Sequence, residues 1–231
     1  MKRLFVIALF AAGFWVGEAS AAALVVVDAR GIALKPGTVL QSGAVLQLKQ
    51  GQHVTLITET GSTLKISGPY DKPPVAVEGG GVTLSSTLQA LVTQREARRG
   101  EFGTTRAATL AKLPDPWLVD ATHGGSGCML ESRQPVFWRQ AVDAASTLTV
   151  EPTDRSWKAR ATWPAGQDRL SITTDVPMRG GETYVVSVGG VESAITMVSV
   201  PAALTNDAMR TAWMAEKGCE AQATALLQTQ K

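Results

Sequence analysis

The sequence is poor in the side chains that bind metals and carry covalent catalysis. Its 231 residues include two histidines, His53 and His123, and two cysteines, Cys128 and Cys219. Their spacing matches no zinc-binding pattern, and no glycine-rich loop stands between a strand and a helix, where phosphates are usually bound. We therefore expect no metal site and no cofactor.

Charge is also scarce, and the two signs nearly cancel. Charged residues make up 18% of the chain, with 22 lysines and arginines against 20 aspartates and glutamates. Nucleic acids and anionic membrane surfaces select a clear basic excess, so the balance excludes a nucleic-acid partner. Long apolar runs are missing as well. The run from Leu4 to Val16 has thirteen residues and falls short of the ~20 needed to span a bilayer.

That apolar run has the features of an export signal. Lys2 and Arg3 form a basic start, the apolar run follows, and small residues that fit a cleavage site stand between Ala19 and Ala23. The alternative is a membrane anchor. We expect residues 1–23 to be a signal peptide that is removed, leaving a periplasmic protein with no stable membrane insertion.

In an oxidising compartment the two cysteines can form a disulfide bond. A disulfide between Cys128 and Cys219 is the favoured interpretation, with two separate buried thiols or a metal site as the alternatives. It would close a loop of about ninety residues, for which the chain-entropy model gives on the order of 4 kcal/mol of stabilisation.

Residues 24–81 show apolar residues at a period of two, interrupted by glycine turns. Leu24 to Val27 indicates a first strand, and later strands alternate at positions such as Leu46 and Leu48 or Val54 and Leu56. His53 falls at an outward position. A period of two with regularly spaced turns predicts a small antiparallel β-module.

The same stretch resembles a known family. A leading GxxLxxGxxL pattern starting at Gly31, a GxxVTL strand from Gly51 to Leu56, a G-S-T-L strand and a closing Gly68-Pro69 are similar to the FecR-like extracytoplasmic domain. The resemblance implies a β-module of the bacterial cell envelope. In the best-known relatives this domain relays a signal from an outer-membrane receptor to a cytoplasmic sigma factor. It therefore also implies a protein partner in the envelope.

Residues 82–116 are expected to form a helix and a linker. Leu84, Leu88, Leu91 and Val92 recur at helical spacing, and Gly100 follows an arginine-rich last turn, as helix ends often do.

Residues 117–200 return to a β pattern, with seven or eight short strands separated by glycine turns. This spacing predicts an immunoglobulin-like β-sandwich. We expect Trp138 and Trp157 to pack in its core rather than to stack on sugars.

Residues 201–231 form an alanine-rich C-terminal helical segment. Met209 and Trp213 are one helical turn apart, Asn206 is a suitable N-cap, and Lys217-Gly218 divides the segment. It is either a helical hairpin or one kinked helix. Its apolar stripe either docks on the sandwich or binds a partner.

One cluster deserves a test for catalysis. Asp120, His123 and Ser126 stand close together before Cys128, and Gly124 to Gly127 resembles half of a nucleophile elbow. The closing glycine of that motif is missing, and the flanking segments indicate antiparallel strands rather than a strand–turn–helix. We interpret this segment as a glycine-rich hairpin loop with a solvent-facing histidine, and predict that the protein is not an enzyme.

The overall prediction is a mainly β protein: a FecR-like β-module and an immunoglobulin-like sandwich, with a helical linker and a C-terminal helical segment. The leading hypothesis is a non-catalytic periplasmic binding or signalling adaptor for an envelope or membrane-sensor partner. An alternative is a structural module associated with the cell wall or glycan, for which a tryptophan or tyrosine exposed in a groove would be the distinguishing feature. A serine hydrolase that uses His123 and Ser126 is the third hypothesis.

Overall fold

The computed structural model describes residues 23–41, 43–75, 112–173 and 177–229. The chain is mainly β with two short helices at its C-terminal end, as predicted. The predicted signal segment up to Ala22 and the predicted helix from Leu84 to Gly100 lie outside the described residues. No helix in the described ranges is long and apolar enough to cross a membrane.

In its described residues, the first module contains six strands in two sheets. They are β1 (Leu24–Arg30), β2 (Val39–Leu40), β3 (Leu46–Leu48), β4 (His53–Ile57), β5 (Thr63–Ser67) and β6 (Tyr70–Lys72). A four-stranded sheet has the order β2-β1-β4-β5, and β3 pairs with β6 in a separate two-stranded sheet. All of these pairings are antiparallel.

The core of this module follows the predicted alternation. Leu46, Leu48, Val54 and Leu56 are all buried in one cluster, to which Ile66 of β5 also belongs. Because side chains alternate between the two faces of a strand, these residues bring both sheets onto a common core. His53 lies on the surface, as predicted.

Two positions in this module show why glycine is required there. Gly37 has a φ of 87°, and the N–H of Thr38 donates to the carbonyl of Lys35, which closes a turn at Lys35-Pro36-Gly37. At Gly68 the chain passes so near the carbonyl of Lys49 that a Cβ atom would collide with it. Only glycine fits such a close approach of two backbones.

The second module contains eight strands in its described residues, in line with the seven or eight predicted. They are β7 (Leu118–Asp120), β8 (Gly125–Leu130), β9 (Val136–Trp138), β10 (Ser146–Pro152), β11 (Ala159–Trp163), β12 (Arg169–Ser171), β13 (Thr183–Val188) and β14 (Val191–Val200). A five-stranded sheet has the order β11-β10-β13-β14-β8, and a three-stranded sheet has the order β12-β9-β7. Residues of both sheets, among them Phe137, Leu148 and Tyr184, share one buried cluster.

The strands on either side of the glycine-rich segment are not purely antiparallel, and this part of the prediction was wrong. β8 runs parallel to β14, and β7 runs parallel to β9. The chain passes from β7 into the other sheet as β8 and then returns as β9. Two reversals bring β9 back beside β7 in the same direction, an arrangement that local alternation does not reveal.

The C-terminal segment is a hairpin of two helices, α2 (Asp207–Glu216) and α3 (Glu220–Gln228). Asn206 caps α2 as predicted, since its Oδ1 accepts a hydrogen bond from the N–H of Met209 at 2.9 Å. Gly218 lies between the helices with a φ of 85°, a conformation that favours glycine.

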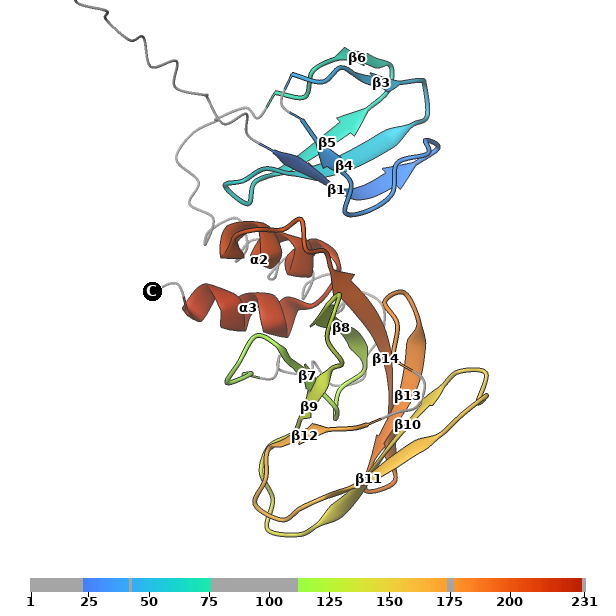
Figure 1. Ribbon diagram of the computed structural model, residues 1–231, viewed down its shortest axis with the longest axis vertical. Helices are drawn as coiled ribbons and strands as arrows, with labels where there is room; N and C mark the ends of the chain where they lie inside the picture. Colours follow the sequence, from blue (N-terminus) through green and yellow to red (C-terminus); the bar gives the residue numbers. More distant parts are fainter. Residues whose placement is uncertain (1–22, 42, 76–111, 174–176, 230–231) are drawn as a thin grey trace, which may run out of the picture.

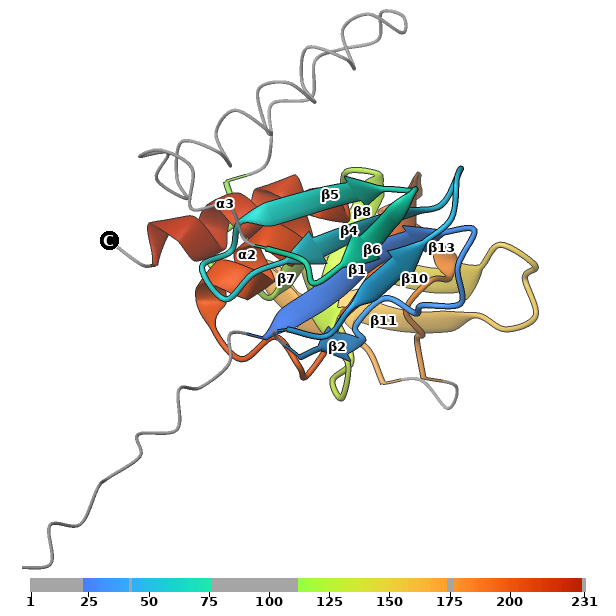
Figure 2. The ribbon, with the colours of Figure 1, turned by 90° about the horizontal axis from the view of Figure 1, so that it is seen from above.

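The two helices form a layer between the two β-modules (Figure 1). One buried cluster joins Val25 and Ile57 of the first module, Val200 of the second, and Met209 and Trp213 of α2. The predicted docking on the sandwich is therefore half of the arrangement, because the same helices also cover β1 and β4. The view from above shows the first module stacked over the helices and the sandwich (Figure 2).

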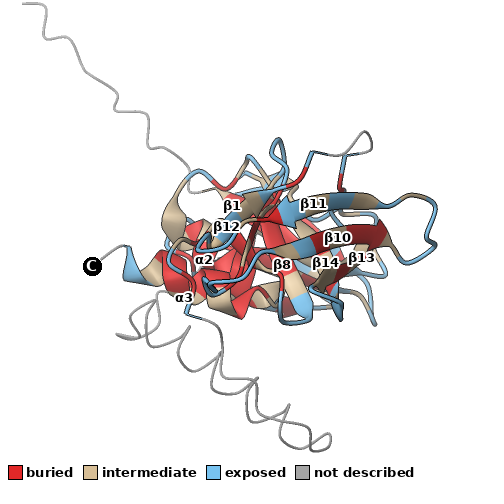
Figure 3. Ribbon diagram, turned by 90° about the horizontal axis from the view of Figure 1, so that it is seen from below, coloured by how far each residue is buried: buried red, intermediate tan, exposed pale blue. Residues whose placement is uncertain are grey.

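The position of the helix layer between the modules determines which residues are buried. β1 is buried on both faces, since Val25 and Val27 contact the helix layer while Leu24 and Val26 face the core of their own module. Figure 3 shows buried residues gathered in the helices and inner strands, whereas parts of β11 are exposed.

Candidate functional site

The predicted disulfide is present. Cys128 of β8 and Cys219 at the start of α3 are bonded; their Cα atoms are 5.9 Å apart, and the two residues are 91 positions apart in the sequence. Both residues are buried in the helix layer. The bond therefore fixes the helical hairpin to the edge of the sandwich.

Gln222 of α3 strengthens the same junction. Its Oε1 accepts a hydrogen bond from the N–H of Cys128 at 2.6 Å, and its Nε2 donates to the carbonyl of Cys128 at 2.7 Å. Nε2 also donates to the carbonyl of Pro116 at 3.0 Å. One buried amide thus satisfies a backbone donor and a backbone acceptor at the outer edge of β8, much as a neighbouring strand would.

The structure brings together two of the three residues weighed as a catalytic cluster. The Oδ2 atom of Asp120 lies 2.8 Å from the Nδ1 atom of His123, and the Oδ1 atom accepts a hydrogen bond from the hydroxyl of Thr122 at 2.6 Å. The side chain of His123 is 53% exposed. Asp120 thus orients an imidazole at the surface.

Ser126 is not part of that arrangement. It lies within β8, where it pairs with Thr196 of β14. Among the described contacts, no hydrogen bond joins Ser126 to His123, so the base–nucleophile contact of a serine hydrolase has no counterpart here. His53, the other histidine, contacts the hydroxyl of Ser67 at the surface through its Nδ1 atom.

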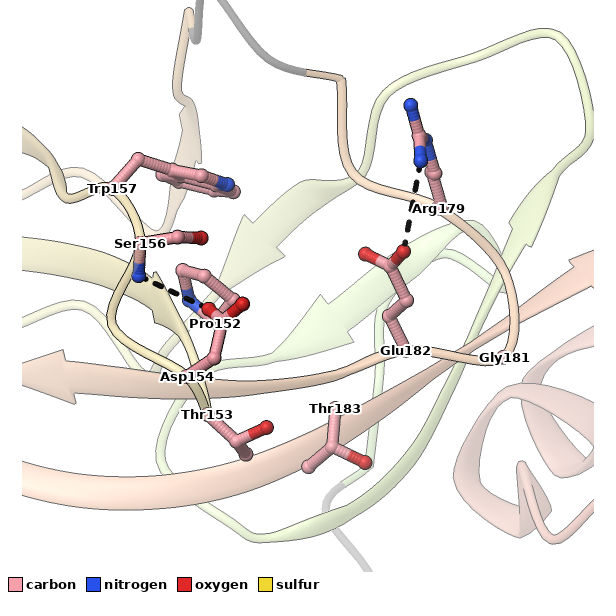
Figure 4. Close-up of a pocket in the computed structure, with 9 residues that line it drawn as sticks. All are labelled: Pro152, Thr153, Asp154, Ser156, Trp157, Arg179, Gly181, Glu182 and Thr183. Atoms are coloured by element: carbon pink, nitrogen blue, oxygen red, sulfur yellow. Dashed lines mark hydrogen bonds and ion pairs between the residues drawn. The ribbon is translucent and has the colours of Figure 1, made fainter.

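A groove of about 550 Å³ opens on the sandwich between the loop that joins β10 to β11 and the turn that precedes β13 (Figure 4). Its size lies within the roughly 300–1,000 Å³ of small-molecule sites. Trp157 stands on one side of it, and Arg179 and Glu182 stand on the other. Thr153, Asp154 and Thr183 also line it.

A single buried residue, Tyr184 of β13, supports both sides of this groove. Its ring packs against the indole of Trp157 with centroids 5.9 Å apart and planes tilted by 48°. Its hydroxyl donates to Oε2 of Glu182 at 2.6 Å and accepts from the N–H of Arg179 at 2.9 Å. Burial, together with the bond to Glu182, raises the pKa of Tyr184 to about 12.

The charges of the groove come from three side chains. The N–H of Ser156 donates to Asp154 at 3.0 Å, and the hydrogen bonds from Ser156 lower the pKa of that carboxyl. Asp154 therefore stays ionised at neutral pH. Arg179 and Glu182 face each other at 4.0 Å, with the Arg179 side chain largely in solvent and that of Glu182 half exposed. The lining thus carries two carboxylates and one guanidinium.

Trp157 is the functional candidate that sequence reasoning placed elsewhere. It was predicted to pack in the core, and one side of it does contact the core cluster, but the residue is only half-buried and lines the groove. Trp138 is also half-buried and packs against a different cluster beside α3. The polar segment from Thr153 to Ser156, directly before Trp157, was the available sign that this tryptophan follows a surface loop.

Comparison of the chain with protein-family models, curated proteins and solved structures finds no match. The resemblance of residues 24–81 to the FecR-like domain therefore remains a prediction.

Proposed function

We propose that this protein is an exported, non-catalytic adaptor of the bacterial envelope that recognises a partner protein. The observation that carries the proposal is the helix layer. Val25, Trp213 and the Cys128–Cys219 bond hold two β-modules together, so that surfaces of both modules are presented in a fixed geometry. Such a covalently fixed layer suits recognition by preformed surfaces. A disulfide is also what an oxidising compartment such as the periplasm permits.

Two sheet edges are the surfaces best placed to take part. In the described part of the chain, β5 pairs with a single strand, β4, and β11 pairs with a single strand, β10. The free side of such a strand offers unpaired N–H and C=O groups to an extended segment of another protein. β5 belongs to the module whose sequence resembles the FecR-like domain, which makes it the first candidate.

Site-specific photocrosslinking in the envelope tests this proposal. The full chain would be produced in a bacterial host with a photoreactive amino acid at Ser67 on β5, at Arg160 on β11, or at Lys35, an exposed turn residue that serves as the control. We expect one partner protein to crosslink from Ser67 or Arg160 and not from Lys35. N-terminal sequencing of the exported chain should start near Leu24.

Two results would contradict the proposal. One is an unprocessed chain that stays in the cytosol. The other is a pattern in which neither edge position yields a crosslink above the level seen at Lys35.

A further inference from the structure

We propose that the groove beside Trp157 binds a saccharide, with the apolar face of one sugar ring on the indole. This site is independent of the protein partner proposed above. Sugar rings carry C–H groups on their faces and hydroxyls around their rims. A matching site needs an aromatic surface surrounded by hydrogen-bonding groups, and the groove supplies both.

The aromatic surface is fixed before any ligand arrives. Trp157 is held by its contact with the buried ring of Tyr184 and by the core cluster beneath it. A ligand that stacks on it therefore does not have to order a mobile side chain, a term that weakens binding at flexible sites.

The polar residues around the indole include both hydrogen-bond donors and hydrogen-bond acceptors. The carboxylates of Asp154 and Glu182 are acceptors, the guanidinium of Arg179 is a donor, and the hydroxyl of Thr153 can serve as either. A sugar hydroxyl also donates and accepts, so a polyol can satisfy all of these groups together. A phosphate-bearing ligand would meet two carboxylates, and a purely cationic ligand would meet Arg179.

Tyr184 connects the aromatic side of the groove to its polar side. Because the hydroxyl of Tyr184 bonds to Glu182 and to the backbone of Arg179 while its ring supports Trp157, the aromatic and polar sides keep a constant separation. Asp154 is likewise held by the N–H of Ser156. Preorganised polar groups of this kind are characteristic of binding sites.

Titration of the disulfide-bonded chain lacking residues 1–23 tests the proposal. The probes are chitotetraose, cellotetraose and maltotetraose, which differ in linkage and in the acetamide group, with tetralysine as a cationic alternative. Binding is followed by calorimetry and by the indole N–H signals of the tryptophans in NMR spectra. We expect at least one tetrasaccharide to bind and to shift the Trp157 signal.

Two variants locate the site. Trp157→Ala removes the stacking surface, and Thr153→Arg fills the groove from an exposed position that leaves the core untouched. Each should weaken saccharide binding at least about tenfold. Thr162→Arg, which adds the same side chain at an exposed position on β11 that is not a lining residue, should leave binding unchanged.

Three outcomes would overturn the proposal. In the first, no tetrasaccharide binds the unmodified chain at millimolar concentration. In the second, a tetrasaccharide binds, but Thr153→Arg and Trp157→Ala bind it as tightly as the unmodified chain does. In the third, tetralysine is the only probe that binds in the groove. A spectrum that keeps the other tryptophan signals in place shows that each variant remains folded.

Discussion

Gln222 shows how much a single amide contributes at the junction of helix and strand. Replacing it with leucine keeps most of the volume but leaves the N–H and C=O of Cys128 buried without their partners. A buried group that loses its partner destabilises by about 1–3 kcal/mol. We expect Gln222→Leu to lower the free energy of unfolding by about 2 kcal/mol in guanidinium denaturation.

The chain offers a matched control for this variant. Gln228 ends the same helix and is exposed, so Gln228→Leu should change the free energy of unfolding by less than about 0.5 kcal/mol. Equal effects of the two substitutions would show that the Gln222 hydrogen bonds contribute nothing specific.

Tyr184 makes stability depend on pH at the alkaline end. Its pKa is about 12 in the folded protein against an ordinary value of 10.0. Below pH 10 both states keep the phenol protonated and its full contribution is present. As pH rises toward 12 the unfolded state ionises first, so stability is lost, on the order of 2 kcal/mol.

The measurement compares wild type with Tyr184→Phe in urea denaturation between about pH 8 and pH 11. We expect the free energy of unfolding of the wild type to fall more steeply than that of the variant. Parallel curves would show that Tyr184 does not ionise differently in the two states.

Apart from the disulfide, which joins the two cysteines of the sequence, the residues that sequence reasoning located correctly are the ones whose partners are close in the chain. Asp120 and His123 are three positions apart, and Asn206 caps the N–H of Met209, so short-range spacing was enough. Gln222 contacts a residue 94 positions away. The groove likewise joins the Trp157 loop to the Glu182 turn, a proximity that alternation within each strand does not reveal.

The disulfide acts on whole elements, because it fastens the helical hairpin to β8. Cys128→Ser combined with Cys219→Ser removes it without leaving a lone thiol. For a loop of this length the chain-entropy model gives a loss of about 4 kcal/mol. We expect the guanidinium midpoint of the double variant to fall well below that of the oxidised wild type. Circular dichroism should show the same fold for both proteins in the absence of denaturant.

A loss below about 1 kcal/mol would contradict this expectation. It would mean that the apolar contacts of Trp213 and Met209 hold the helices in place without the covalent bond.

Strand positions were predictable, but their partners and directions were not. The short β runs of residues 117–200 form strands, because the alternation of apolar and polar residues depends only on neighbouring positions in the sequence. The parallel pairing of β8 with β14 depends on an encounter between segments some seventy residues apart. β1 is a similar case, since the continuous apolar run Leu24–Val27 predicted a strand without showing that a helix layer covers its second face.

The whole molecule differs most from the sequence-based prediction. Two modules with a linker and a C-terminal helical segment were expected, whereas helices α2 and α3 form the layer that joins the first module to the second. Asn206 adds to this junction by donating a hydrogen bond to the carbonyl of Glu59 at 3.1 Å, and Lys65 lies 3.7 Å from Glu216. We therefore expect the chain to unfold as one cooperative unit.

Val25→Asp tests that cooperativity. Val25 is fully buried against the helices, while the core of its own module is built from other residues such as Val26 and Leu56. A carboxylate at this position is expensive to bury, so the first module should separate from the helix layer and still keep its own core. We expect two unfolding transitions in place of one. Hydrogen exchange should quicken in α2 and β1, while β10 and β13 stay protected.

Val39→Asp is the control, because Val39 lies on neighbouring β2 and is 40% exposed. It should preserve the single transition. If Val25→Asp merely lowers the midpoint of one transition, with exchange rising evenly across both modules, then the modules are coupled through contacts other than those of the helix layer. The fixed geometry on which the proposed adaptor role depends would then come from those other contacts. Two separate transitions would instead show that the helices after Pro201 hold the two modules in this geometry.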